Sequence, residues 1–133
     1  MRLLLDTHVF VWWDDESPAL ARALREVIAD PGNEIYVSAA SVWEIAIKRR
    51  RGKIAFLGGI KETVLRNRFR NLPITPDHAE HAGGLPLHHR DPFDRMLIAQ
   101  TVLESMALGT QDEMMRPYGV LTIGLPPGGG AAG

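Results

Sequence analysis

The feature that most constrains the fold of this chain is the alternation of short apolar runs with longer segments of helical character. Residues 2–5, 35–37, 107–110 and 120–123 have the length and the aliphatic or β-branched content of buried strands. Segments with helical spacing or capping signals separate these runs. Strands that alternate with helices form parallel sheets covered on both faces. The sequence therefore predicts a three-layer α/β/α domain with a mainly parallel central sheet.

Capping signals place the helices between these strands. Ser38 and Asp91 are typical N-cap residues, and we expect helices over residues 39–51 and 92–105 after them. Ser17, followed by Pro18, predicts a further helix that continues to about Asp30. The remaining helices are expected over residues 8–14, 60–70 and 76–82, with a short helical turn at 113–115. A short extended piece is expected at residues 72–74.

The length of the chain bounds its organisation. With 133 residues and 45% of them hydrophobic, it suits one compact domain that buries roughly two thirds of its unfolded surface. We expect that domain to occupy residues 1–123. Residues 124–133 are rich in Pro and Gly, so we expect a disordered C-terminal tail there.

Composition excludes several classes of function. The chain has no Cys, which rules out disulfide scaffolds, thiol nucleophiles and cysteine-ligated metal centres and fits a reducing cytoplasm. No apolar run approaches the ~20 residues that a membrane span needs. The net charge of −1 argues against a uniformly basic nucleic-acid-binding surface. We therefore expect a cytoplasmic protein without a membrane partner.

Three acidic residues follow predicted strands. Asp6 ends the first apolar run, Glu44 lies in the helix after the second, and Asp112 comes just after the third. Ligands of open parallel sheets gather beyond the carboxyl ends of the strands, so these acids should share one edge of the domain. Asp94 can join them, because Leu97, Ile98 and Thr101 stand at i+3, i+4 and i+7 on the same helical face.

A capping role is the alternative for most of these acids. Asp6 could cap the helix near His8, and Asp112 could cap the turn that follows it. Asp91 is explained as an N-cap, and Asp94 as an acid favoured in the first helical turn. Glu44 has no such explanation, because it lies past the first turn among apolar residues, where an unpaired carboxylate is costly.

Carboxylates brought together repel one another and need positive charge between them. No Lys or Arg stands immediately beside Asp6 or Glu44 in the sequence. Oxygen ligands without Cys select a hard cation, Mg²⁺ or Mn²⁺, rather than Zn²⁺. Mg²⁺ combines with few carboxylates and a substrate phosphate, which points to phosphodiester chemistry.

Three motifs occur in an order that resembles a known family: LLLDTH at residues 3–8, SAASVWEIAIK at residues 38–48 and HRDPFDRMLIAQ at residues 89–100. They are similar to PIN domains, and more narrowly to the VapC-type ribonuclease toxins of VapBC toxin–antitoxin pairs. The resemblance covers nearly the whole chain to about Ile123. It departs from the family at Gly109, where a β-branched residue is usual, and at Gln111, where a basic residue is frequent.

The resemblance implies a site and partners. It carries the family's catalytic and metal-binding quartet onto Asp6, Glu44, Asp94 and Asp112, which would hold Mg²⁺ or Mn²⁺ and position a water for attack on an RNA phosphodiester. Thr7, Thr110 and Asp91 match residues that support the ligands. An RNA substrate, a cognate antitoxin protein and a homodimer are also implied.

The chain also has basic residues that are candidates for RNA binding. These residues, Lys48, Arg49, Arg51 and Arg90, could bind the RNA backbone, although cations at a helix C-terminus also complement the helix dipole.

Two alternative functions of the chain stay open. One is a catalytically idle protein-interaction module whose acids are caps, and the other is a Mg²⁺-dependent phosphatase that acts on small phosphate esters.

Overall fold

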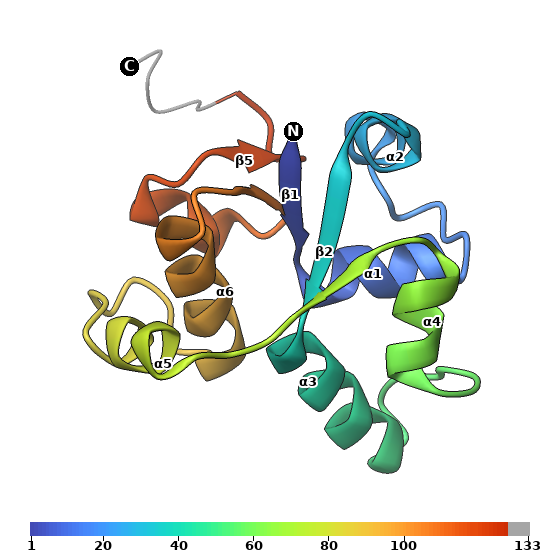
Figure 1. The fold of residues 1–133 in the computed structure, drawn as a ribbon, viewed down its shortest axis with the longest axis horizontal. Helices are drawn as coiled ribbons and strands as arrows, with labels where there is room; N and C mark the ends of the chain where they lie inside the picture. The colour runs from blue at the N-terminus through green and yellow to red at the C-terminus, as the bar shows by residue number, and fades with distance from the viewer. Residues whose placement is uncertain (128–133) are drawn as a thin grey trace.

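Five short strands form one parallel sheet in the computed structural model, which describes residues 1–127 (Figure 1). The strands are β1 (Arg2–Leu5), β2 (Glu34–Ser38), β3 (Arg70–Leu72), β4 (Ala107–Gly109) and β5 (Thr122–Ile123). Their order across the sheet is β3-β2-β1-β4-β5, and every neighbouring pair is parallel. The predicted parallel α/β architecture is confirmed.

Helices cover both faces of this sheet because the strand residues alternate in direction. Leu3 and Leu5 of β1 pack with residues of α1 (Thr7–Asp14), α2 (Arg22–Ala29), α3 (Ala39–Arg50) and α4 (Ile60–Arg66). Leu4, between them, packs on the other face with residues of α6 (Pro92–Leu103) and η1, a 3₁₀ helix (Glu113–Tyr118). Helix α5 (Pro76–Gly83) packs against α6 (Figure 1). Two apolar cores, one on each face, therefore hold the sheet in place.

The predicted start of the second helix is wrong. The helix begins at Arg22 rather than at Pro18, and the Ser17 hydroxyl accepts a hydrogen bond from Ala19 N in a local turn. The Gln111 side chain explains the delay: its Oε1 accepts from Ala21 N at 2.8 Å and its Nε2 donates to Ala19 O at 3.1 Å. These bonds hold Ala21 in an extended conformation, so the helix starts after it.

The predicted helix at residues 60–70 is too long. It ends at Arg66, and Arg68 adopts a left-handed backbone conformation with φ of 62°. This turn directs Phe69 into the core, where its ring contacts the rings of Phe10 and Trp13. The next strand then begins at Arg70, two residues before the extended piece that the sequence predicts.

The C-terminal segment is described as far as residue 127. Arg116 Nη2 donates a 2.7 Å hydrogen bond to Pro126 O, which ties residue 126 to η1. The prediction of a disordered tail over 124–133 falls mostly on residues 128–133, which lie outside the described residues. Within residues 1–127, every helix is too short or too polar to cross a membrane.

Candidate active site

A pocket of about 440 Å³ opens beyond the carboxyl ends of β1, β2 and β4. Chain topology brings the acids there: Asp6 directly follows β1, Glu44 lies in the helix after β2, and Asp112 follows β4. Asp94 arrives on α6. The pocket is lined by Asp6, His8, Val9, Trp12, Glu44, His89, Asp91, Asp94, Gln111 and Asp112. All four acids that the sequence predicted at this edge of the sheet therefore line one pocket.

Asp6 is fixed between β1 and β4. Its backbone N–H donates to Gly109 O at 2.8 Å, and its Oδ2 accepts a 2.7 Å hydrogen bond from Thr110 Oγ1. Its carboxylate does not cap α1, although Asp6 occupies the N-cap position. Burial raises the pKa of the Asp6 carboxyl, and the hydrogen bond from Thr110 opposes that rise. A capping role therefore does not account for Asp6.

Glu44 is buried, and only one of its two carboxylate oxygens has a hydrogen-bond partner among the described residues. Its Oε2 accepts from Lys48 Nζ at 2.6 Å, whereas its Oε1 has no hydrogen-bond partner among the residues that the structure describes. Sequence analysis looked only for basic residues immediately beside Glu44 and found none. It therefore missed Lys48, which lies one helical turn later on α3. Spacing of i and i+4 places the two side chains on one helical face. The hydrogen bond to Glu44 also raises the pKa of Lys48.

The pKa of Asp94 is strongly raised by its surroundings in the pocket. Its pKa is raised from 3.8 to about 8, first by burial and then by the charges of Asp6, Asp91, Glu44 and Asp112. A carboxyl in this position holds its proton at neutral pH unless positive charge arrives. Such a shift, in a pocket lined by further acids, is typical of a functional site.

Asp91 and Asp112 both serve as helix caps. Asp91 Oδ1 accepts from Phe93 N at 2.8 Å at the start of α6, and Asp112 Oδ1 accepts from Met114 N at 2.9 Å at the start of η1. The second oxygen of Asp112 remains directed at the pocket, where Oδ2 lies 3.1 Å from His89 Nε2. Capping and pocket lining are therefore compatible in Asp112, because each uses a different oxygen.

The two threonines named by the sequence lie in different environments. Thr110 Oγ1 donates to Asp6 and accepts from Asp112 N at 3.0 Å, so it joins two of the acids. Thr7 Oγ1 donates instead to Ser41 Oγ at 2.8 Å in the buried contact between α1 and α3. Thr110 thus touches the acids directly, whereas Thr7 holds together the helices that carry the pocket wall.

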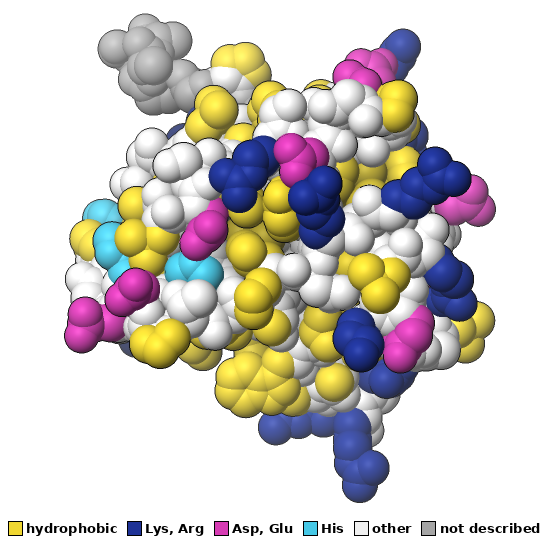
Figure 2. Space-filling model, viewed as in Figure 1, with side chains coloured by type: hydrophobic (Ala, Val, Ile, Leu, Met, Phe, Trp, Pro, Cys, Tyr) yellow, Lys and Arg dark blue, Asp and Glu magenta, His cyan; other side chains and the backbone are white. Residues whose placement is uncertain are grey.

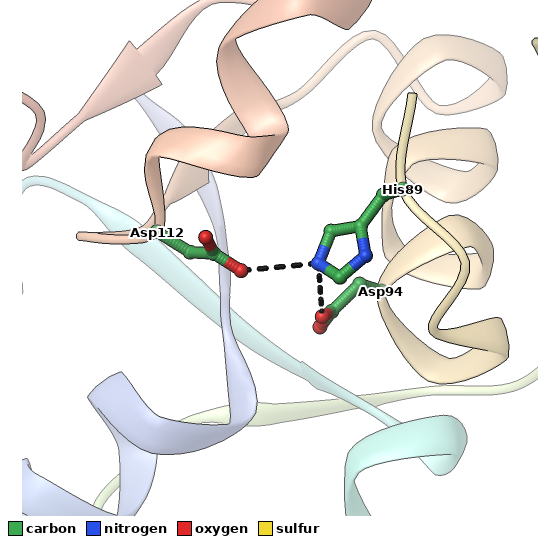
Figure 3. Close-up of side chains that lie close together, drawn as sticks. All are labelled: His89, Asp94 and Asp112. Carbon is green, nitrogen blue, oxygen red and sulfur yellow. Dashed lines mark hydrogen bonds and ion pairs between the residues drawn. The ribbon is translucent and has the colours of Figure 1, made fainter. Parts of the chain in front are cut away.

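His89 is a pocket residue whose contact with the acids sequence reasoning missed. Figure 3 shows its ring between Asp94 and Asp112, with Nε2 2.9 Å from Asp94 Oδ2 and 3.1 Å from Asp112 Oδ2. In the sequence, His89 stood out only as the first residue of the third motif, at residues 89–100. Its position two residues before the Asp91 cap was the available signal, since that segment must pass close to the first turn of α6.

Basic side chains gather at the C-terminal end of α3 (Figure 2). Two of the candidate RNA contacts there already have partners within the chain: Lys48 binds Glu44, and Arg49 Nη1 donates to Phe56 O and Gly58 O. Arg51 and Arg90 are exposed. The contact of these residues with RNA stays a prediction. Arg51 and Arg90 are better placed for it than Arg49, whose guanidinium already binds two backbone carbonyls.

The departures at Gly109 and Gln111 have a structural explanation. A Cβ at residue 109 would lie 3.1 Å from Leu24 Cδ2 and 3.2 Å from Leu5 Cδ2, so Gly109 makes room for α2 on the sheet. Gln111 uses its amide to hold Ala19 and Ala21 ahead of the same helix. Both departures therefore serve the placement of α2 and leave Asp112 in the pocket.

Fold and site together define a class: a parallel α/β domain whose carboxylates from four separate segments line one pocket. Comparisons with known proteins name that class. The PIN domain family matches residues 3–120. Ribonuclease VapC22 of Mycobacterium tuberculosis is 30% identical over 119 residues, which cover 87% of this chain and 91% of that protein.

Solved structures show the same fold at lower identity. VapBC2 from Rickettsia felis, solved bound to a DNA fragment from their promoter, matches with a TM-score of 0.64 at 14% identity, covering 92% of this chain and 97% of that chain. VapBC-1 from nontypeable Haemophilus influenzae matches with a TM-score of 0.64 at 17% identity, covering 92% and 96% of the two chains. This chain belongs to the PIN domain family, and within it to the VapC type.

Proposed function

We propose that this chain is a Mg²⁺- or Mn²⁺-dependent endoribonuclease and the toxin of a type II toxin–antitoxin pair. The observation that carries the proposal is the convergence of Asp6, Glu44, Asp94 and Asp112 on one pocket. The similarity to a protein named ribonuclease supports RNA as the substrate. The VapBC assemblies of the same fold support a protein partner.

The donor set fits a hard divalent cation. Glu44 Oε1 is buried without a hydrogen-bond partner among the described residues, and burying a carboxylate oxygen unpaired is costly. A cation in the pocket would satisfy that oxygen. It would also offset the burial and the neighbouring negative charges that together raise the pKa of Asp94 to about 8. Four carboxylates offer oxygen ligands, which favour Mg²⁺ or Mn²⁺.

The residues have separate tasks in the proposed reaction. Asp6 and Asp94 would hold the cation near the scissile phosphate, while Glu44 and Asp112 would orient the attacking water or a second ion. Thr110 keeps Asp6 in place through its hydroxyl, and Lys48 keeps Glu44 in place from the side of α3. When bound, the cation lowers the pKa of the attacking water and stabilises negative charge on the phosphate oxygens. No side chain has to act as a nucleophile.

The partners follow from the same proposal. We expect an antitoxin segment to cover the acidic pocket, and a basic side chain is the chemistry that suits four carboxylates. We also expect two copies of this chain to associate. Size-exclusion chromatography with light scattering, for the chain alone and after co-expression with the product of the neighbouring reading frame, tests both expectations.

The direct test is cleavage of an RNA pool by purified protein with Mn²⁺, followed by sequencing of the new RNA ends. Wild-type protein should produce defined ends, and Asp6→Asn should produce none while retaining the wild-type unfolding midpoint within a few degrees. Asp77→Asn is the matched control, because Asp77 is an exposed acid outside the pocket. Cleavage by Asp6→Asn at the wild-type rate would refute the assignment.

Two controls separate the alternatives. A small-molecule phosphatase would hydrolyse a chromogenic phosphate monoester and leave the RNA pool intact. An idle interaction module would show no thermal stabilisation by Mn²⁺, whereas a ligand that binds the folded state raises the unfolding temperature with concentration. The pocket geometry argues against the idle module, because the Asp6 carboxylate does not cap α1 and Glu44 Oε1 has no hydrogen-bond partner among the described residues.

A further inference from the structure

The ring of His89 occupies the space between two of the proposed metal ligands. Its Nε2 lies 2.9 Å from Asp94 Oδ2 and 3.1 Å from Asp112 Oδ2 (Figure 3). One ligand atom from each of these three residues lies within 4.8 Å of the other two. The imidazole therefore contacts the same carboxylate oxygens that a divalent cation would use.

The backbone around His89 indicates which ring nitrogen carries hydrogen. The N–H of Asp91 is directed at His89 Nδ1, 3.3 Å away, so Nδ1 accepts a hydrogen bond. A neutral imidazole has one donor and one acceptor nitrogen, which leaves the hydrogen on Nε2. A histidine that binds a metal through Nε2 has the opposite arrangement, because its other nitrogen donates a hydrogen bond. In this structure His89 Nε2–H therefore donates to Asp112 Oδ2 at 3.1 Å, and the same nitrogen lies 2.9 Å from Asp94 Oδ2.

The loop that carries His89 is anchored from two sides. The Arg95 guanidinium on α6 donates to four backbone carbonyls of the loop and its approach, those of Ala82, Leu85, Pro86 and His89. The Tyr118 hydroxyl on η1 accepts from His89 N at 2.9 Å and donates to Pro86 O at 2.8 Å. Because its backbone is held at these points, movement of the His89 ring away from the carboxylates requires rotation of the side chain.

We propose that His89 is a built-in occupant of the cation position between Asp94 and Asp112. Its Nε2–H binds the Asp112 carboxylate and its ring fills the space beside Asp94 Oδ2, so a divalent cation binds there only after the ring has turned away. His89 thus sets the cation concentration at which the pocket fills. The inference rests on the proposed function, since it assumes that these carboxylates are metal ligands.

Calorimetric titration of the metal-stripped full chain with MnCl₂ and with MgCl₂ tests this role. His89→Ala should bind Mn²⁺ about tenfold more tightly than wild type, because the hydrogen bond from Nε2 to the Asp112 carboxylate no longer has to be broken. His89→Gln keeps an N–H donor and should remain near the wild-type affinity. His88→Ala is the matched control, since His88 is the neighbouring exposed histidine and packs edge-to-face against Tyr118 rather than lining the pocket.

The outcomes of this titration are distinct. Tighter binding by His89→Ala with no change in His88→Ala supports the proposal. Equal affinity overturns it, and weaker binding by His89→Ala overturns it in favour of His89 as a metal ligand. If neither wild type nor any variant binds either cation, the metal-dependent function itself fails, which is a different result from the loss of this inference alone.

Imidazole NMR spectra of the wild-type chain test the proposal without a substitution. In the metal-free protein, the two-bond ¹H–¹⁵N correlations of His89 should have the pattern of the Nε2–H tautomer. Saturation with Mg²⁺ should move them to values of a solvent-exposed ring and leave those of His88 unchanged. An Nε2–H pattern that persists unshifted at saturation, or conversion to an Nδ1–H ring with Nε2 bound to the cation, would overturn the proposal.

Discussion

Thr110 donates a 2.7 Å hydrogen bond from its Oγ1 to Oδ2 of Asp6, and this contact joins the ends of two neighbouring strands in the buried floor of the pocket. The same hydroxyl accepts from Asp112 N at 3.0 Å. Thr110 thereby orients the Asp6 carboxylate directly and holds Asp112 in place through the backbone N–H of Asp112. The contact also opposes the rise that burial causes in the pKa of Asp6.

Replacing Thr110 with Val should therefore disturb the pocket without changing its shape. Asp6 would lose its donor, at a cost of about 1–3 kcal/mol in the free energy of unfolding at neutral pH. The pKa of Asp6 should rise further, so cation binding should weaken. Urea denaturation and Mn²⁺ titration measure the two effects. Thr110→Ser keeps the hydroxyl and should behave as wild type in both; a Val variant as stable as wild type would show that the hydrogen bond contributes nothing.

The raised pKa of Asp94 predicts how the stability of the metal-free protein depends on pH. The unfolded carboxyl ionises near 3.8, whereas the folded one keeps its proton up to about 8. Between these values the folded state binds more protons than the unfolded state, so the free energy of unfolding falls as pH rises. Below 3.8 and above about 8 this group adds no further slope. Burial raises the pKa of Asp6 as well, which acts in the same direction.

Asp94→Asn should remove much of this slope. The variant should gain stability over metal-free wild type most at pH 8 and least near pH 4, because Asn carries no charge to bury. Thermal unfolding measured across pH 4–8 checks this, with Asp77→Asn as the exposed control. A stability difference between Asp94→Asn and wild type that stays constant across this range would contradict the raised pKa. Mn²⁺ at saturation should stabilise wild type and have little effect on the variant.

Much of this architecture was predictable because it depends on local patterns. Ser38 and Asp91 do accept hydrogen bonds from the first turns of their helices, as the sequence predicted. The convergence of Asp6, Glu44 and Asp112 follows from one rule, that carboxyl ends of parallel strands share an edge. Asp94 was placed by helical spacing from the buried residues Leu97 and Ile98.

What the sequence could not supply depends on contacts between distant residues. Gln111 delays the start of α2 through bonds to Ala19 and Ala21, and no local signal near Ser17 reveals that tether. His89 reaches Asp112 across 23 positions of the chain. The end of α4 is set by Phe69, whose ring packs in the core. Each miss has the same physical cause: a tertiary contact overrides a local preference.

Lys48 should stabilise Glu44 in the absence of a cation. Its Nζ lies 2.6 Å from Glu44 Oε2, and Glu44 is buried while Lys48 is partly exposed. Lys48→Met should lower the free energy of unfolding of the metal-free protein by about 1–2 kcal/mol, less than for a fully buried pair because solvent screens the lysine. Chemical denaturation measures the loss. Lys61→Met, an exposed lysine on α4, is the control.

A double variant tests the origin of that loss. If Lys48→Met destabilises because Glu44 is left as an unpaired buried charge, then adding Glu44→Gln should recover most of the stability. Two losses that simply add would mean that the pair is not coupled, and Lys48 would then act through packing of its aliphatic chain. Mn²⁺ should stabilise Lys48→Met more than wild type, since the cation replaces the missing positive charge.

The exposed arginines Arg51 and Arg90 give the RNA-binding prediction its sharpest test. Each phosphate contact that is lost should reduce the slope of log K against log[salt] by about 0.7 for single-stranded RNA. Arg51→Ala and Arg90→Ala, measured in the Asp6→Asn background to prevent cleavage, should each weaken binding several-fold and lower the slope by about that amount. Arg22→Ala is the control, because Arg22 is exposed on α2 and pairs with Glu26. Variants that bind RNA with the wild-type slope would exclude these arginines from the RNA path.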